Sequence, residues 1–366
     1  MKTVISAVTA VLMLTSSISS ANADSSELNI RSVDLYTTAV EGGRGAALAV
    51  LKDGTLLLAG GRVGDTLFQY QNDQLTSLGK LLKQSERERD SRFGPTDIAV
   101  LSENAKRLQL LISYPQLNRP QNCVRLVVFR FTVYRVNQSI DKQERWFLGK
   151  PCVPVGAVQH AAGRMQVIDS KSAYLTTGDL GFRKINQVSA RGWLGGVFEI
   201  SARSVKQISQ GHRNPQGILS IGADLYISEH GPRGGDEINL IKQSKDYGWP
   251  FVTFGAPYGP GDYIKPGKTG VHTGYEPPIY QWTPSVAPTE LVQLPNNQSW
   301  KQFANHIVMG TLAAQSLIFM ELTAPDKIGK VTQIDIGERV RDLEVMPGGD
   351  LVATTDSGRL LFINLR

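Results

Sequence analysis

The chain has 366 residues, of which 41% are hydrophobic and 20% charged, and its 39 Lys and Arg against 33 Asp and Glu give a net charge of +6. This mild excess is spread along the chain. The one dense charge run, residues 86–92, alternates in sign and contains none of the aromatic residues on which bases would stack, so we expect no nucleic-acid partner. No segment after the N-terminus approaches the roughly 20 uninterrupted apolar residues of a membrane-spanning helix, so we expect no membrane span.

The first 23 residues are predicted to be a secretion signal. Lys2 gives a positive start, an apolar run follows from Val8 to Leu14, and Ala21-Asn22-Ala23 forms a small-x-small cleavage site. The mature protein would then begin at Asp24 and would be periplasmic or secreted. An uncleaved N-terminal anchor is the alternative.

Six units of similar pattern follow, each a short alternating strand, a turn and a second β-rich strand. They begin at Ala46, Thr96, Gly163, Gln216, Thr289 and Val340. Turn signals such as Asp53-Gly54 fall between the apolar alternations, as hairpins require. The repeat predicts an all-β fold, a six-bladed β-propeller of four-stranded blades, as a single domain over residues 24–366. A large β-sandwich or two β-domains would be the competing architecture.

Cys123 and Cys152 are the two cysteines of the chain. In an exported protein an even count favours a disulfide, although two separately buried thiols are the alternative. The sequence shows no CxxC motif or Cys/His cluster that would indicate zinc.

The segment GHRNPQG, residues 211–217, places Arg213 and Asn214 directly before the fourth unit, and so at the loop end of a blade. Arg213 offers a rigid fork of donors that could bind a carboxylate or a carbonyl oxygen, and Asn214 can donate and accept. An arginine that ties loops together is the plainer interpretation.

The segment EHGPRGGDEINL, residues 229–240, continues from the same unit. Its glycines and proline force an irregular backbone, whose carbonyls cannot all join a sheet. With Asp236, Glu237 and Asn239 close behind, an oxygen-lined calcium site is plausible because calcium takes six to eight oxygens. The spacing is not that of an EF-hand, so an acid-rich turn is the alternative.

These two segments, followed by YGWP at Tyr247–Pro250, resemble the soluble pyrroloquinoline quinone (PQQ) dependent glucose and aldose sugar dehydrogenases. The likeness includes QHAAGRM from Gln159, TTGDLG from Thr176, APTE from Ala287 and ERVRDLEV from Glu338. It covers most of residues 155–366, whereas earlier residues share mainly the repeat pattern. It implies an enzyme that oxidises a sugar at its anomeric hydroxyl to a lactone, with hydride passing to PQQ, with calcium, and with an external electron acceptor.

The resemblance makes His160 the general base, and an imidazole suits this role because it titrates near neutral pH. Asp179 in the following turn could orient the imidazole or stabilise its charge. From the residues alone, a histidine satisfied by nearby backbone is the alternative for His160.

The resemblance also assigns the cofactor and metal contacts. The quinone would be contacted by Arg213 and Asn214, and the tricarboxylate by the pair Arg339 and Arg341, which alternate along a strand and so share a face. The main-chain carbonyls of Gly231 and Pro232 would hold a catalytic calcium, and Glu237 and Tyr247 a structural one. The alternatives are a surface pair for the two arginines and core packing for Tyr247 and Trp249, which is our preferred interpretation for Trp249.

The sequence departs from the family at three places. Ala313 stands where a lysine usually reaches the quinone, and loss of that charge-assisted contact would weaken cofactor binding about 10- to 100-fold unless another residue compensates. RFGPTDI, residues 92–98, replaces a segment near the sugar, so substrate contacts should differ and the sugar is not identified. WLGGVFEI, residues 193–200, has no physical interpretation at this level.

Ala313 supports an alternative function, that of a non-catalytic calcium-binding propeller acting as a carbohydrate-binding or interaction module. The partner expected under the main hypothesis is a small sugar, and the protein would be a monomer or a homodimer.

Overall fold

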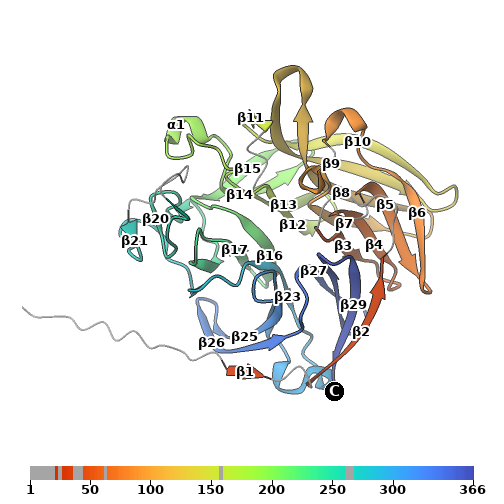
Figure 1. Cartoon of the computed structure of the whole chain (residues 1–366). Helices are drawn as coiled ribbons and strands as arrows, with labels where there is room; N and C mark the ends of the chain where they lie inside the picture. The colour runs from red at the N-terminus through yellow and green to blue at the C-terminus, as the bar shows by residue number, and fades with distance from the viewer. Residues whose placement is uncertain are drawn as a thin grey trace, which may run out of the picture.

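The computed structural model describes residues 21–23, 27–35, 44–61, 64–88, 90–155, 160–259 and 268–366. The predicted all-β class is confirmed, because the strands form a six-bladed β-propeller whose sheets are arranged around one axis (Figure 1). Residues 1–20 of the predicted secretion signal lie outside the described residues, and so does Gln159.

The six blades follow one another in chain order, and the strands of each are given from the innermost outward. The first three blades are β3 (Ala47–Val50), β4 (Leu56–Gly60), β5 (Gly64–Gln71) and β6 (Gln74–Lys80); β7 (Asp97–Glu103), β8 (Arg107–Asn118), β9 (Cys123–Tyr134) and β10 (Ser139–Leu148); and β12 (Ala162–Asp169), β13 (Ser172–Thr177), β14 (Gly196–Ser201) and β15 (Val205–Gln210). The last three are β16 (Pro215–Ile221), β17 (Asp224–Glu229), β18 (Asp236–Leu240) and β22 (Tyr280–Trp282); β23 (Pro288–Gln293), β24 (Ile307–Thr311), β25 (Ser316–Ala324) and β26 (Lys327–Asp335); and β27 (Val340–Val345), β28 (Leu351–Thr355), β29 (Arg359–Leu365) and β2 (Leu28–Asp34).

The innermost strands β3, β7, β12, β16, β23 and β27 each begin within one residue of a unit predicted from the sequence. Each contacts the innermost strand of the next blade, and β27 contacts β3, so the ring is closed. The N-terminal strand β2 completes the last blade by pairing with β29, from Leu28 opposite Leu365 to Asp34 opposite Arg359. Closure in this way protects the edges that an open sheet of this length would expose.

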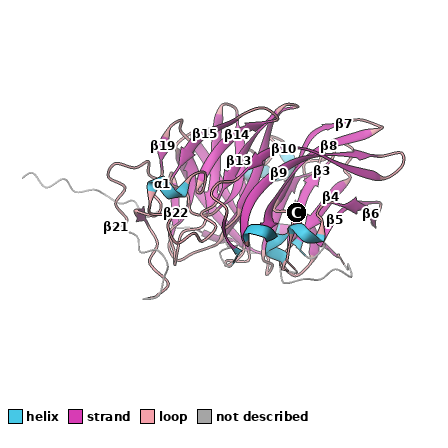
Figure 2. Cartoon of the chain, turned by 90° about the horizontal axis from the view of Figure 1, so that it is seen from above, coloured by secondary structure: helices cyan, strands magenta, loops and turns pink. Residues whose placement is uncertain are grey.

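A few short elements lie outside the four-strand pattern (Figure 2). They are β1 (Ala21–Ala23), which pairs in parallel with β26, β11 (Val153–Pro154), β19 (Lys245–Asp246), the pair β20 (Val252–Thr253) and β21 (Lys268–Thr269), the helix α1 (Val188–Arg191), and the 3-10 turns at Gln84–Glu86, Ser91–Phe93, Arg119–Gln121 and Gln298–Phe303. Strand β1 consists of residues that the secretion-signal prediction places before the cleavage point. In the described part of the chain, no helix has the length and apolar character needed to cross a membrane.

The hydrophobic core lies between neighbouring blades. In the largest cluster, Leu57 and Leu67 of the first blade pack with Leu110 and Ile112 of the second, and all four are fully buried. Burial of such side chains stabilises a fold by roughly 1.5–3 kcal/mol each, so the blades hold one another in place through their faces.

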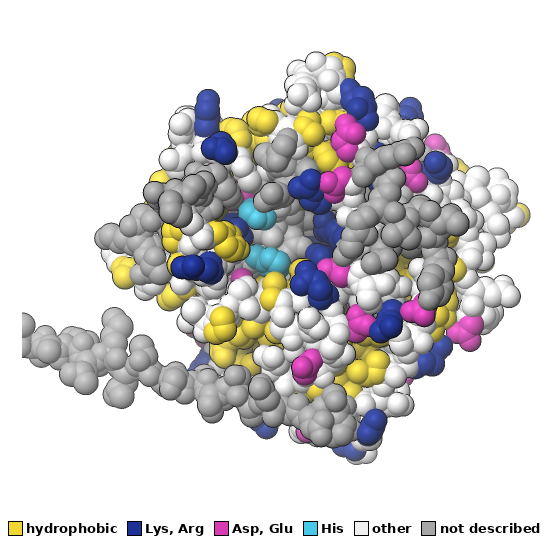
Figure 3. Space-filling view, in the orientation of Figure 1, with side chains coloured by type: hydrophobic (Ala, Val, Ile, Leu, Met, Phe, Trp, Pro, Cys, Tyr) yellow, Lys and Arg dark blue, Asp and Glu magenta, His cyan; other side chains and the backbone are white. Residues whose placement is uncertain are grey.

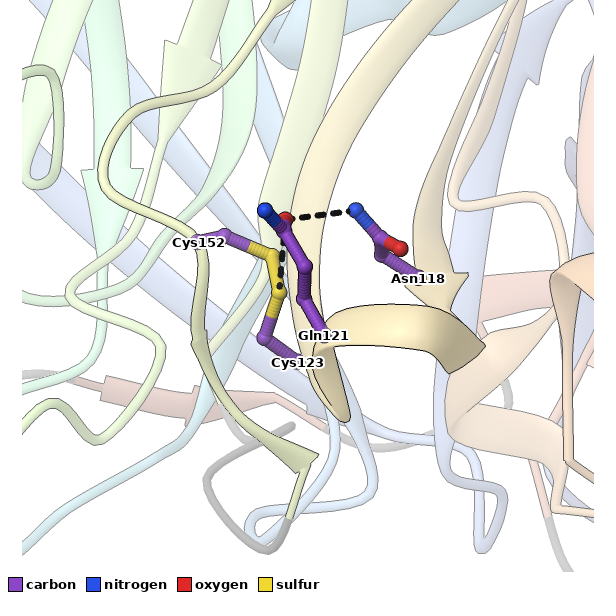
Figure 4. Close-up of a disulfide and its surroundings, with 4 residues drawn as sticks. All are labelled: Asn118, Gln121, Cys123 and Cys152. Atoms are coloured by element: carbon purple, nitrogen blue, oxygen red, sulfur yellow. Dashed lines mark hydrogen bonds between the residues drawn. A yellow bond between two sulfur atoms is a disulfide. The ribbon is translucent and has the colours of Figure 1, made fainter.

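The predicted disulfide between Cys123 and Cys152 is confirmed (Figure 4). Cys123 begins β9 and Cys152 lies directly before β11, which pairs with β9. The Cα atoms are 5.5 Å apart, and the residues are separated by 29 positions in the sequence. The bridge therefore ties the start of β9 to the residue before β11, which itself pairs with β9.

The propeller axis holds a buried ion cluster around Arg164 of β12, which is 1% exposed. Its Nη1 lies 2.7 Å from Asp342, 3.4 Å from Glu290 and 3.6 Å from Asp97. Burial acts to lower the pKa of Arg164, but the carboxylates raise it overall, so the guanidinium stays charged. One cation thus joins strands β7, β12, β23 and β27.

Each of the three carboxylates also connects two blades through backbone N–H groups. Asp97 accepts from Ile98 of its own strand and from Met165 of the next blade. In the same way, Glu290 accepts from Leu291 and Ile218, and Asp342 from Leu343 and Leu48. Burial raises the pKa of Asp97 to about 7 and that of Glu290 to about 8, although Arg164 acts to lower both.

We expect Arg164→Met to destabilise the protein by about 3–5 kcal/mol at pH 8, because the variant leaves buried carboxylates without their cation. The loss should be smaller at pH 5, where Asp97 and Glu290 are protonated and repel less. Urea unfolding measures both values. As a control, Arg130→Met removes the more exposed pair with Glu144, 3.2 Å apart, and should cost less than about 1 kcal/mol. Equal losses in the two variants would contradict the structural importance of the cluster.

The double variant Cys123→Ser/Cys152→Ser should lose about 3 kcal/mol of unfolding free energy, since the bridge closes a loop of about 30 residues. Unfolding with and without a thiol reductant provides the measurement. The reductant should destabilise the wild type and leave the double variant unchanged, whereas an effect on both would show that it acts elsewhere.

Candidate active site

His160 and Asp179 meet at one end of the third blade. His160 lies two residues before β12, and Asp179 lies two residues after β13. The Nδ1 atom of His160 is 2.8 Å from Oδ1 of Asp179. Asp179 is fully buried and accepts further hydrogen bonds from Gly181 N and from Trp249 Nε1, at 2.7 and 2.9 Å. Burial acts to raise the pKa of Asp179, but the charges of His160 and Arg213 lower it overall. An ionised, fixed carboxylate therefore faces the imidazole.

Arg213 lies on the other side of the imidazole, with Nη2 3.3 Å from His160 Nε2. Because a guanidinium can only donate, this contact makes Nε2 the acceptor and assigns the ring proton to Nδ1, toward Asp179. Arg213 Nη1 also donates to Gly231 O at 2.7 Å and to His230 O at 3.2 Å. The guanidinium carbon is 5.4 Å from the Trp249 ring centroid, a cation–π distance.

The backbone around His160 is specified by glycines. His160 itself has φ of +52°, a left-handed conformation uncommon for a side chain of its size. A Cβ atom at Gly178 would overlap the His160 carbonyl oxygen, so only glycine allows this close approach. Gly195 N donates to Gly178 O, and His212 N donates to Gly195 O. The WLGGVFEI segment, for which the sequence offered no interpretation, thus connects the His160 turn to the 211–217 loop.

The acidic residues of the 229–240 segment have different environments. Asp236 accepts hydrogen bonds from Gly231 N, Val286 N and Ala287 N, so it joins this loop to the next connection. Glu229 accepts from Arg213 N at 3.1 Å and from Asn239 Nδ2 at 2.9 Å. The carboxylate of Asp236 therefore holds two loops together, whereas the carboxylate of Glu229 binds the backbone of Arg213.

A small cavity of about 10 Å³ lies beside these residues, lined among others by Glu229, Glu237 and Tyr247. Burial and the Glu229 carboxylate raise the pKa of Glu237 well above its ordinary value. The Oδ1 atom of Asn239 is buried without a hydrogen-bond partner. The carboxylates that line this space of one water or ion, with the Asn239 amide bonded to both of them, could hold a cation.

Tyr247, the other predicted ligand, is 3% exposed and stacks on His212 with ring centroids 4.6 Å apart. Its phenol donates to Leu240 O and accepts from Lys242 N. A ligand role would therefore fall to its main-chain oxygen. Among the described residues no group of three or more His, Cys, Asp or Glu is arranged for a metal, so an ion here would depend on amide and carbonyl oxygens as well.

Arg339 and Arg341 share one carboxylate, that of Asp356. Arg341 donates from Nε and Nη2, each at 2.9 Å, and Arg339 from Nε at 3.0 Å. Asp356 also accepts from Gly45 N at 2.8 Å, and Arg339 Nη1 donates to Leu312 O at 3.1 Å. The predicted pair is thus brought together on one anchor that fixes both guanidinium groups.

The structure brings some predicted site residues into direct contact and leaves others apart. His160, Asp179, Arg213 and Gly231 form one connected set, and Arg339 and Arg341 form a second set around Asp356. Asn214 is buried and accepts from Gln216 through its Oδ1 at 2.8 Å, and Pro232 is buried beside Gly255. Figure 3 shows histidine, lysine and arginine side chains gathered around the middle of one face, where the channel opens.

Sequence reasoning missed Asp356 and underestimated Trp249. Asp356 follows Thr354-Thr355 at the end of β28, much as Asp179 follows Thr176-Thr177-Gly178, and this repeated ending was a usable signal. Trp249 belongs to a hydrophobic cluster, as expected, but its indole N–H also donates to Asp179.

The molecule is therefore a six-bladed propeller with a histidine–aspartate pair, the guanidinium group of Arg213 and an arginine pair at the start of β27. Residues 43–362 match the Glucose / Sorbosone dehydrogenase family, and the chain belongs to that family.

Individual relatives match over shorter stretches of sequence. The chain is 37% identical over 164 residues to the aldose sugar dehydrogenase YliI of Escherichia coli, covering 43% of each protein. It is 26% identical over 158 residues to quinoprotein glucose dehydrogenase B of Acinetobacter calcoaceticus, covering 34% of this chain and 32% of that one. The aligned stretches thus span less than half the length of these relatives.

Solved structures show the same fold over nearly the whole chain. The apo form of the soluble E. coli aldose sugar dehydrogenase has a TM-score of 0.73 at 22% identity, covering 92% of this chain and 99% of that one. The PQQ-bound aldose sugar dehydrogenase of Streptomyces coelicolor has a TM-score of 0.67 at 20% identity with the same coverage.

Proposed function

We propose that the protein is a quinoprotein that oxidises an aldose at its anomeric hydroxyl to the lactone, with PQQ and calcium at the propeller mouth and an external electron acceptor. Family membership and the PQQ-bound structural neighbour support this proposal. The observation that carries it is the Asp179–His160–Arg213 arrangement. The predicted secretion signal would place this activity in the periplasm or outside the cell.

The residues at the mouth fit a cofactor with three carboxylates. The guanidinium groups of Arg339 and Arg341 are fixed by Asp356, and bidentate guanidinium groups suit carboxylates. Arg213 and Asn214 would contact the quinone end. When bound, PQQ supplies the hydride acceptor.

His160 would take the proton of the sugar hydroxyl at Nε2. Asp179 holds Nδ1–H, fixes the ring and stabilises the imidazolium that forms, as a buried carboxylate can. For a hydroxyl group to reach Nε2, Arg213 Nη2 must first turn away, since it now lies 3.3 Å from that atom. The chain's own contribution is thus a base of defined tautomer.

The fit for calcium differs between the two proposed sites. At the catalytic site, Gly231 O accepts from Arg213 at 2.7 Å, so Gly231 and Pro232 could hold calcium only after Arg213 has moved. The same movement of Arg213 would uncover His160 Nε2. At the structural site, the cavity beside Glu237 already gathers oxygens, and we propose that Glu237 and Tyr247 bind calcium there with Glu229 and Asn239.

The alternative is a calcium-binding propeller without catalysis, acting as a carbohydrate-binding or interaction module. Ala313, which is followed by Ala314, supports this alternative because it supplies no charge for the cofactor. Cofactor uptake distinguishes the two functions.

The protein purified without cofactor and then reconstituted with PQQ and calcium should reduce an artificial electron acceptor when aldoses are added. His160→Ala should lower kcat by about 10²–10⁴-fold because the general base is lost, and Asp179→Asn should lower kcat in the same direction. His306→Gln, a substitution in the fifth-blade loop, is the matched control and should keep wild-type turnover. Absence of PQQ uptake at micromolar concentration, or full activity of His160→Ala, would reject the proposed function.

Calcium should raise the melting temperature of the metal-free wild type, and Glu237→Gln should abolish most of this shift. Without calcium, Glu237→Gln should be at least as stable as the wild type, because burial and Glu229 already disfavour the charged form of Glu237 and a neutral amide carries no such charge. Differential scanning fluorimetry measures both effects, with the exposed Asp141→Asn as control. A full calcium shift in Glu237→Gln would place the ion elsewhere.

A further inference from the structure

Arg44, before the first strand of the first blade, is fixed next to the arginine pair. The following residue, Gly45, donates its N–H to Asp356 Oδ1 at 2.8 Å, the same carboxylate that binds Arg339 and Arg341. A Cβ atom on Gly45 would lie 2.7 Å from Arg341 Cβ and from Thr355 O, so the backbone approaches β27 and β28 as closely as glycine permits.

The Arg44 carbonyl is fixed from the other side. A Cβ atom on Gly61 would come within 2.4 Å of Arg44 O and closer still to Gly45 O, so these two backbone segments are packed against each other. Arg44 is thus placed by contacts on both sides rather than by a loose loop.

Positive charge exceeds negative charge around Arg44. Its side chain forms no ion pair within 4.0 Å in the described part of the chain, whereas Asp356 is shared by Arg339 and Arg341. The next carboxylate inward, Asp342, lies 2.7 Å from Arg164. Burial, Arg341 and Arg164 lower the pKa of Arg44 to about 9, and Asp356 and Asp342 offset this only in part. Among the described residues, Asp356 is thus the carboxylate next to Arg44, Arg339 and Arg341, while Asp90, whose pKa Arg44 also helps to lower, is paired with Arg92 at 2.6 Å.

We propose that Arg44 is a third guanidinium contact for the carboxylates of the anionic cofactor, a specificity-determining residue contributed by the first blade. This inference rests on the proposed function. A partly buried cation beside other cations is stabilised when a polyanion binds next to it, and a tricarboxylate offers one carboxylate for each of Arg44, Arg339 and Arg341.

Arg44 would supply its charge from a different side of the mouth than position 313. Ala313 follows Leu312, whose carbonyl accepts from Arg339, whereas Arg44 is adjacent to Arg341 through Gly45. A cation of the first blade therefore offsets the missing cation of the fifth blade. The ligand keeps a positive charge beside it, but that charge comes from a different blade.

Equilibrium binding of PQQ to the metal-free and calcium-loaded protein, followed by quenching of tryptophan fluorescence, tests this inference without measuring turnover. We expect Arg44→Ala to raise Kd about 10- to 100-fold and Arg44→Lys to raise it less, because lysine keeps the charge. Arg31→Ala is the matched control, since Arg31 is an exposed arginine on β2 paired with Asp73, and its Kd should equal that of the wild type.

Thermal unfolding without cofactor separates ligand binding from a structural role. Arg44→Ala should be as stable as the wild type or more stable, because like-charge repulsion with Arg341 and Arg164 is removed. A lower melting temperature together with unchanged Kd would overturn the inference. If the wild type binds PQQ and Arg44→Ala binds equally well, the inference fails while the proposed function stands. If the wild type binds no PQQ, both fail.

Discussion

The buried contact of Arg164 with Asp97, Glu290 and Asp342 is the interaction on which the arrangement of the blades depends. Hydrophobic faces hold neighbouring blades together, but such packing is non-directional and tolerates sliding. Charge-assisted bonds to a buried guanidinium are directional, and an uncompensated buried charge is costly. The cluster therefore fixes the height of four inner strands relative to one another, and the carboxylates pass this register to neighbouring blades through backbone N–H groups.

This register determines where the site residues lie, because His160 and the arginines of the site stand at or just before the inner strands that the cluster holds in place. Arg164 Nη2 donates to Arg341 O at 2.9 Å, and the next residue, Asp342, binds Arg164 through its side chain. Asp342, which binds Arg164 at the axis, is therefore adjacent in the chain to Arg341, which binds Asp356. His160 lies four residues before Arg164, on the same strand and its approach. A displacement of the axis cluster would move both sets of site residues.

The mouth combines two kinds of constraint. Asp179 and Asp356 each gather several donors and so hold a histidine and an arginine pair in defined positions. Arg213, in contrast, bonds to main-chain oxygens and to His160 Nε2, contacts that an incoming ligand or cation can replace. Preorganised anchors beside one exchangeable side chain would suit the proposed function, in which a cofactor, a metal and a sugar bind close together.

The sequence by itself determined the local features of this protein. Six strand–turn–strand units, each beginning within one residue of an inner strand, follow from period-2 alternation and turn chemistry, and two cysteines in a chain predicted to be exported favoured one disulfide. The grouping of His160, Asp179 and Arg213 was anticipated only through family resemblance. The tertiary structure alone decided that Asp356 anchors the arginines, that Trp249 donates to Asp179 and that Arg164 lies on the axis. The physical reason is that these contacts join residues far apart in the sequence, and their distances depend on how the blades are set around the axis, which no local pattern encodes.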